Sequence, residues 1–311
     1  MTQSPLRSRT SFRNMRPPRS TGGRLAVMVV LFLMVTALAA GVRAVAGTNP
    51  FLSLIAGAVV AVGALKVYAV AVRVVEGRGL PELDPTTTVS GLRTGTLAGL
   101  LLFSTTIALI ALFGGYGTKG GVSVGGAVAV LGTMAGVAVV EELLFRAIVF
   151  RLVEQLVGTR GVLALTALLF GGLHLVNSGA TVWGALAIAV EAGLMLGAAY
   201  AATRTLWVPI GLHFGWNFAE SGLFGTTVSG NDGAPAGLVH GVLSGPTAVT
   251  GGTFGPEASI FAIIVCAVPT LVFLRMAKRR GHLHTRAELK AATGTATGTA
   301  TGTDTEATTG P

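Results

Sequence analysis

The stretch VAVVEELLFRAIVF, residues 137–150, decides the fold class of this chain. It is almost wholly apolar, yet Glu141, Glu142 and Arg146 interrupt it. It lies within a longer apolar run, 126–155, which is long enough to cross a lipid bilayer as an α-helix. Continuous rather than alternating apolar residues favour a helix over a membrane strand. We therefore predict a membrane-spanning helix that carries ionisable groups in its interior.

Seven further apolar runs of similar character flank this one. They are 25–42, 51–72, 95–115, 161–177, 181–203, 206–224 and 258–275. The first is longer than the apolar region of a signal peptide, so we prefer an uncleaved helix over that alternative. Apolar residues make up 51% of the chain and charged residues 11%, against about 25% charged in soluble domains. We predict an all-α, polytopic membrane helix bundle with about eight transmembrane helices.

The net charge of +9 is unevenly distributed. Basic residues gather in 1–24, 73–93, 151–160 and 275–290, whereas 225–257 contains no Lys or Arg. Basic connections face the cytoplasm in membrane proteins, which predicts a cell-membrane protein with both termini cytoplasmic. The same distribution makes the lipid bilayer a partner and argues against nucleic acid. Nothing in the sequence sets an oligomeric state.

The chain divides into three regions. Residues 1–24 predict a basic disordered cytoplasmic tail, 25–280 a multi-pass transmembrane domain, and 281–311 a low-complexity cytoplasmic tail. Glu154, His282 and His284 lie at cytoplasmic ends, where we expect them to be solvated.

Ionisable groups at membrane depth are costly unless they are paired or face water, so they point to function. Glu142 and Arg146 are four residues apart and can form an ion pair on one helix face, while Glu141 points about 100° away. If the helices containing Glu141 and His174 form a hairpin that turns near Thr159, these two side chains lie at similar depth.

Two more polar side chains, His213 and Asn217, share a face of the run 206–224 and can donate to a common oxygen. Glu191 also lies at membrane depth, and the sequence gives it no partner on its own helix.

Three short motifs then stand in order: EELLFR at 141–146, FGGLH at 170–174 and HFGWN at 213–217. This arrangement resembles the CPBP family of intramembrane proteases, which includes the CAAX prenyl endoproteases and bacteriocin-processing relatives. The resemblance covers about residues 126–224, the expected protease core.

The resemblance implies a catalytic set of Glu141, Glu142, Arg146, His174, His213 and Asn217. Glu141 corresponds to the glutamate that activates water, assisted by His174, and Arg146 orients or neutralises the carboxylates. His213 and Asn217 correspond to the pair that stabilises the oxyanion. The implied function is an intramembrane endopeptidase that hydrolyses a peptide bond of a membrane-associated protein or peptide.

Three alternatives stay open at this point. Glu141, His174 and His213 are adequate zinc ligands, so a zinc-dependent version of the protease competes with the cofactor-free glutamate mechanism that we favour. A non-proteolytic binding or immunity protein and a transporter with a carboxylate relay are the other two.

Overall fold

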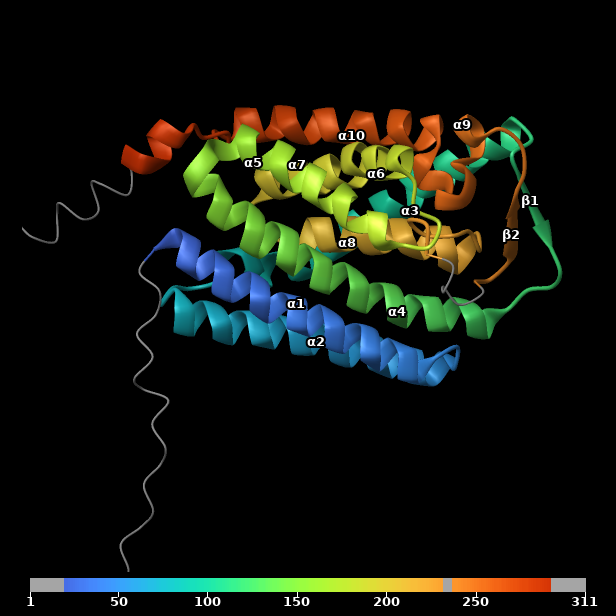
Figure 1. Cartoon of the computed structure of the whole chain (residues 1–311), viewed down its shortest axis with the longest axis horizontal. Coiled ribbons are helices and arrows are strands. Elements are labelled where there is room, and N and C mark those ends of the chain that lie inside the picture. The colour runs from blue at the N-terminus through green and yellow to red at the C-terminus, as the bar shows by residue number, and fades with distance from the viewer. Residues whose placement is uncertain (1–19, 232–236, 292–311) are drawn as a thin grey trace, which may run out of the picture.

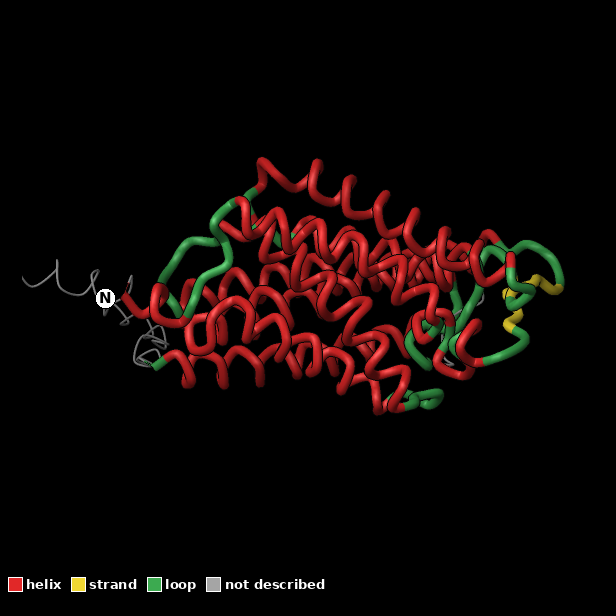
Figure 2. Tube along the Cα trace, turned by 90° about the horizontal axis from the view of Figure 1, so that it is seen from above, coloured by secondary structure: helices red, strands yellow, loops and turns green. Residues whose placement is uncertain are grey.

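The computed structural model describes residues 20–231 and 237–291, and helices dominate it. The helices are α1 (Thr21–Ala46), α2 (Pro50–Val75), α3 (Thr88–Leu112), α4 (Val124–Glu142), α5 (Arg151–Leu173), α6 (Val182–Ile188), α7 (Met195–Thr203), α8 (Trp207–Asn217), α9 (Thr247–Thr250) and α10 (Ile260–Arg279). The two strands β1 (Tyr116–Lys119) and β2 (His240–Leu243) form a small antiparallel pair. The predicted all-α bundle is confirmed, with the strands confined to one end of the molecule (Figures 1 and 2).

Within the described residues, six helical segments are long and apolar enough to cross a membrane. The expectation of about eight differs from this count for two reasons. Two of the expected runs lie in one helical segment, Val124–Val176. The run near 206–224 forms only an 11-residue α-helix followed by a 6-residue π-helical segment, Phe218–Leu223.

The predicted turn between the two motif-bearing helices falls at Gly158. Its φ of 77° and ψ of 170° break the helical path inside α5. After this break the chain reverses direction (Figure 1), and the second part of α5 returns to the segment that follows α4, where the rings of Phe170 and Phe145 lie 5.0 Å apart. A Cβ at position 158 would lie 2.9 Å from the carbonyl oxygen of His284, so a side chain here would also displace the segment that covers the turn.

The covering segment is the short stretch that follows α10. The backbone amide of Thr159 donates to the carbonyl of His284 at 2.9 Å, and His282 Nδ1 lies 3.0 Å from the carbonyl of Ala201. His282 and His284 are therefore half-buried rather than solvated. The Thr/Gly repeat from 292 onward and the N-terminal residues 1–19 lie outside the described residues.

Glycines allow the helix that bears the third motif to pack closely. On α3, a Cβ at Gly95 would lie 2.3 Å from the carbonyl oxygen of Val208, and a Cβ at Gly99 2.3 Å from that of Leu212. On α8, a Cβ at Gly215 would lie 2.3 Å from the carbonyl oxygen of Thr96. Small residues let membrane helices approach until their backbones touch, and this contact fixes α8 against α3.

Ion pairs link the helix ends where α2 stops and α5 starts. Arg151 binds Glu76 at 2.5 Å, and Arg78 binds Glu82 at 2.7 Å. Glu154 was expected to be solvated, but this expectation is wrong. Its side chain is buried and pairs with Arg204 at 2.6 Å, because the end of α7 folds back against α5.

Candidate active site

The Glu142–Arg146 pair forms the buried base of the site. Arg146 Nη1 donates to Glu142 Oε1 at 2.8 Å, and both side chains have no exposed surface. The predicted ion pair is thus present. Arg146 Nη2 also donates to the carbonyl of Gly193 at 3.1 Å. Because this one guanidinium binds both the Glu142 carboxylate and the Gly193 carbonyl, it fixes the end of α4 against the chain around Gly193.

Aromatic rings complete the surroundings of this pair. The Arg146 guanidinium lies 5.1 Å from the ring centroid of Phe170, within the range of a cation–π interaction. The same Phe170 ring lies 4.8 Å from the ring of His174 and 6.0 Å from that of His213. Phe170 is therefore the packing centre that holds side chains from all three motifs at fixed distances.

Local helix geometry changes at the acidic residues. The segment Leu143–Phe150 after Glu142 is π-helical, and so are Ala189–Leu194, which contains Glu191, and Phe218–Leu223, which contains Glu220. π-helical turns are rare and occur often at functional sites, since the extra residue per turn redirects side chains. These three segments contain or directly follow the buried acids Glu142, Glu191 and Glu220.

His213 lies between the two glutamates. Its Nδ1 is 2.9 Å from Glu142 Oε1, and its Nε2 is 3.9 Å from Glu141 Oε2. Because a carboxylate accepts, Nδ1 carries a proton that it donates to Glu142. Glu142 therefore joins Arg146 and His213, while Glu141 keeps 28% of its side chain exposed. Within the described part of the chain, no Lys or Arg forms a salt bridge with Glu141.

His174 directly follows α5, and one nitrogen of its ring makes a hydrogen bond. Its Nδ1 lies 2.7 Å from the carbonyl oxygen of Phe170. A carbonyl only accepts, so the proton of the neutral ring is on Nδ1, and Nε2 keeps a lone pair. This nitrogen can accept a proton or a hydrogen bond from a molecule in the cavity that His174 lines.

A cavity of about 740 Å³ brings four of the six predicted residues together. Glu141, His174, His213 and Asn217 line it, and they come from α4, from the residue that follows α5, and from α8. The other two, Glu142 and Arg146, are buried beside it and are not among its lining residues. The cavity thus holds the groups that can act on a ligand, and the ion pair supports them.

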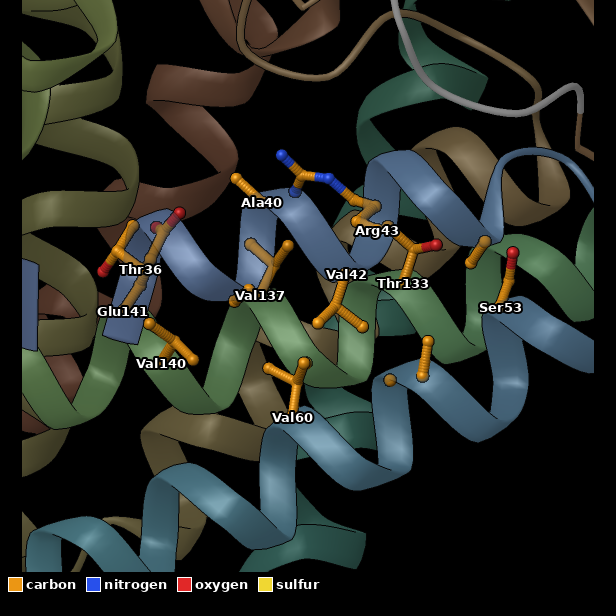
Figure 3. Close-up of a pocket in the computed structure, with 15 residues that line it drawn as sticks. Thr36, Ala40, Val42, Arg43, Ser53, Val60, Thr133, Val137, Val140 and Glu141 are labelled. Atoms are coloured by element: carbon orange, nitrogen blue, oxygen red, sulfur yellow. The ribbon is translucent and has the colours of Figure 1, made fainter. Parts of the chain in front are cut away.

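A smaller pocket of about 130 Å³ adjoins Glu141 between α1, α2 and α4 (Figure 3). Its lining includes Thr36 and Arg43 of α1, Ser53 of α2 and Thr133 of α4. Glu141, Thr36, Arg43 and Thr133 also line the larger cavity, so the two hollows meet along the face of α1. This contact between the hollows makes α1 a wall of the site, which no motif in the sequence indicated.

Two buried acids near the site were missed by the sequence analysis. Glu220 and Glu257 are at most 1% exposed, and Glu257 lines the cavity together with Glu191. An acid within the apolar run 206–224 was a sufficient signal for Glu220. The sequence contains no such signal for Glu257, because this residue lies in a connection whose composition predicts that it faces outward.

Glu141, His174 and His213 are the side chains that a zinc ion would use here. In the part of the chain that the structure describes, no three His, Cys, Asp or Glu side chains lie close enough together to hold a metal ion. His213 Nδ1 is bound to Glu142 and His174 Nδ1 to a carbonyl, which leaves one nitrogen on each ring. One free nitrogen per ring is what a zinc ligand needs, so the donor chemistry is compatible with zinc, whereas the side chains are not close enough together in this structure to share one ion.

One protein family matches the segment of the chain that contains the candidate site. Residues 123–219 match the family model described as type II CAAX prenyl endopeptidase, Rce1-like. No curated protein and no solved structure matches the chain significantly. The matched segment begins just before α4 and ends after Asn217, so it contains all three motifs and the buried ion pair. Over these residues the chain is similar to the type II CAAX prenyl endopeptidases.

Proposed function

We propose that this protease uses Glu141 as the base that activates water, without a metal ion. The proposal rests on the convergence of four side chains on one cavity: Glu141, His174, His213 and Asn217. Among the described residues, no Lys or Arg forms a salt bridge with the Glu141 carboxylate. Peptide hydrolysis requires a base for the water and hydrogen-bond donors for the oxyanion of the tetrahedral intermediate.

In this mechanism the water binds between Glu141 and the free Nε2 of His174. Glu141 takes a proton as the water oxygen attacks the carbonyl carbon of the substrate. The C–N bond then breaks, and the proton moves to the leaving amine. Asn217 donates its amide to the oxyanion, and His213 donates from Nε2 when its ring carries both protons. Glu142 and Arg146 are positioning residues, since Glu142 binds His213, Arg146 binds Glu142, and neither lines the cavity.

Substrate trapping with Glu141→Gln tests the assignment. The variant should retain its fold and bind a membrane-associated protein that the wild type then cleaves, while Glu288→Gln, at an exposed acid outside the bundle, serves as the active control. An active Glu141→Gln enzyme would refute the role of Glu141. Proton-coupled solute uptake by reconstituted protein, with no proteolysis, would favour the transporter instead.

Metal dependence needs a separate measurement on the active, purified protein. We expect less than stoichiometric zinc and unchanged turnover during a chelator titration. Stoichiometric zinc, together with activity that chelator removes and zinc alone restores, would replace the proposal by the metal-dependent mechanism with Glu141, His174 and His213 as ligands.

We further propose that the protein lies in the cell membrane with both termini cytoplasmic. Described basic residues crowd the end that contains the start of α1, the turn at Gly158 and the last turns of α10 (Figure 1). The cavity contains no residue from that end, whereas Thr48, Asn177 and Asn231 from the opposite connections line it. This supports access for substrate from the extracytoplasmic side or from the bilayer.

Single cysteines test this orientation, because the native Cys266 is buried. A membrane-impermeant maleimide should label Thr48→Cys in intact cells and label Arg279→Cys only after lysis. The opposite pattern would reverse the orientation and place the access on the cytoplasmic side.

A further inference from the structure

Three carboxyl groups that the proposed mechanism does not use are buried around the catalytic cavity. Glu191 and Glu220 lie in the π-helical segments Ala189–Leu194 and Phe218–Leu223, and Glu257 lies in the short turn Pro256–Ala258. Each is at most 1% exposed. Glu191 and Glu257 line the cavity, whereas Glu220 does not. Glu191 and Glu257 thus belong to the cavity wall, with the Glu191 oxygens covered by neighbouring atoms.

The partners of these acids are few. Glu257 accepts hydrogen bonds from Ser229 Oγ at 2.6 Å and from Trp216 Nε1 at 3.2 Å. Neither oxygen of Glu191 makes a hydrogen bond of ordinary geometry, and the same holds for Glu220. The polar groups near Glu191 are the Glu257 carboxyl and the Cys266 thiol, which is a weak donor.

No protein cation compensates this group of acids. Within the described residues, no Lys, Arg or His forms a salt bridge with Glu191, Glu220 or Glu257. The only Lys or Arg among the lining residues is Arg43, on the last turn of α1, which forms a different wall. A buried acid without a cationic partner either keeps a proton or binds a cation, because neither water nor protein donors replace the solvation of its charged form.

The cation that fits is an organic one. No three acidic, His or Cys side chains of the described chain are close enough together to hold a metal ion, so direct coordination is not favoured. The cavity of about 740 Å³ has room for a peptide segment with one long side chain. We propose that Glu191 and Glu257 form a subsite for a basic side chain, Lys or Arg, close to the scissile bond of the substrate. This subsite rests on the proposed function, since it belongs to the same cavity.

A binding measurement tests the subsite without requiring turnover. The probes are n-butylguanidinium and its uncharged analogue n-butylurea, added to detergent-solubilised protein while thermal unfolding is followed. We expect the cation, and not the urea, to raise the midpoint of the wild type and of Glu141→Gln. Glu191→Gln should bind the cation about 10- to 100-fold more weakly, as expected for loss of one charge-assisted contact.

Glu288→Gln is the control, because Glu288 is an exposed acid that does not line the cavity. It should bind the cation like the wild type. Equal shifts by the cation and the urea in the wild type would overturn the proposal, and so would equal cation binding by Glu191→Gln and wild type. If Glu191→Gln does not fold, Glu257→Gln and the wild-type comparison of the two probes decide the question.

Cleavage specificity provides the second measurement. Internally quenched peptides that differ only by Lys or norleucine at each position near the cleaved bond would be compared by kcat/KM. The wild type should prefer Lys at one position, and Glu191→Gln should lower that Lys-to-norleucine ratio about 10- to 100-fold. A wild type that binds the cation and cleaves no peptide would count against the proposed function alone, whereas cleavage with no preference for Lys would refute the subsite alone.

Discussion

Replacement of Arg146 by Ala should destabilise the protein by about 3–5 kcal/mol, the usual cost of leaving one partner of a buried ion pair alone. Both side chains are fully buried, so water cannot replace the 2.8 Å bond to Glu142. The substitution also removes the 3.1 Å bond to the Gly193 carbonyl and the contact with Phe170. His213 remains as the one hydrogen-bond partner of Glu142.

The assay is reversible unfolding in mixed micelles, followed by tryptophan fluorescence. The control is Arg160→Ala, which removes an exposed arginine and should change stability by no more than about 0.5 kcal/mol. The double variant Glu142→Gln/Arg146→Met should recover most of the lost stability, because it leaves no buried charge. An Arg146→Ala protein as stable as the Arg160→Ala control would refute the reasoning that the ion pair is buried and uncompensated.

Three further predictions concern the supports of the site. Gly95→Leu should separate α3 from α8 and lower the free energy of unfolding by about 1–3 kcal/mol or more in the same assay. Gly22→Leu, where a side chain would meet open space, is the control and should be nearly neutral. Equal losses of stability in the two variants would refute the close contact between the helices. Arg204→Ala should destabilise more than Arg160→Ala, since it leaves Glu154 buried without its ion-pair partner. Partial burial would by itself raise the pKa of Glu76, but Arg151 and Arg78 outweigh it and hold that pKa below its usual range. The stabilisation from Glu76 is therefore present above about pH 4.3, the ordinary pKa of a glutamate, and is lost as the pH falls through the lower pKa of the folded state. Glu76→Gln should lower the melting temperature at pH 7 and make the melting temperature decline less steeply in acid. A variant whose melting temperature follows the wild-type acid profile would contradict this.

The spacing of residues along the chain was enough to predict much of the candidate site. The interval of four between Glu142 and Arg146 is enough to predict their ion pair, because helix geometry alone places them on one face. The hairpin argument for Glu141 and His174 also succeeded in bringing both to one cavity, since the turn occurs at Gly158, next to the expected Thr159. The roles of these residues in catalysis stay predictions.

Contacts between distant segments could not be obtained in this way. The partner of Glu154 is Arg204, 50 residues later, and Glu142 binds His213 across 71 residues. Glu257 lies in a segment whose composition is that of an exposed loop, yet the fold turns it inward to Ser229 and Trp216. Such contacts depend on how helices are arranged around each other, and periodicity within one helix contains no information about that arrangement.

The sequence by itself determined the membrane class, the helical fold and the three motifs, because hydropathy and the 3.6-residue helix period are local properties of the chain. Only the tertiary structure decided that α1 forms one wall of the cavity and that Glu191, Glu220 and Glu257 gather around it. The physical reason is that burial and electrostatic partnership arise from packing between helices. In this protein, glycine contacts such as Gly95 against Val208 and the π-helical turns set that packing.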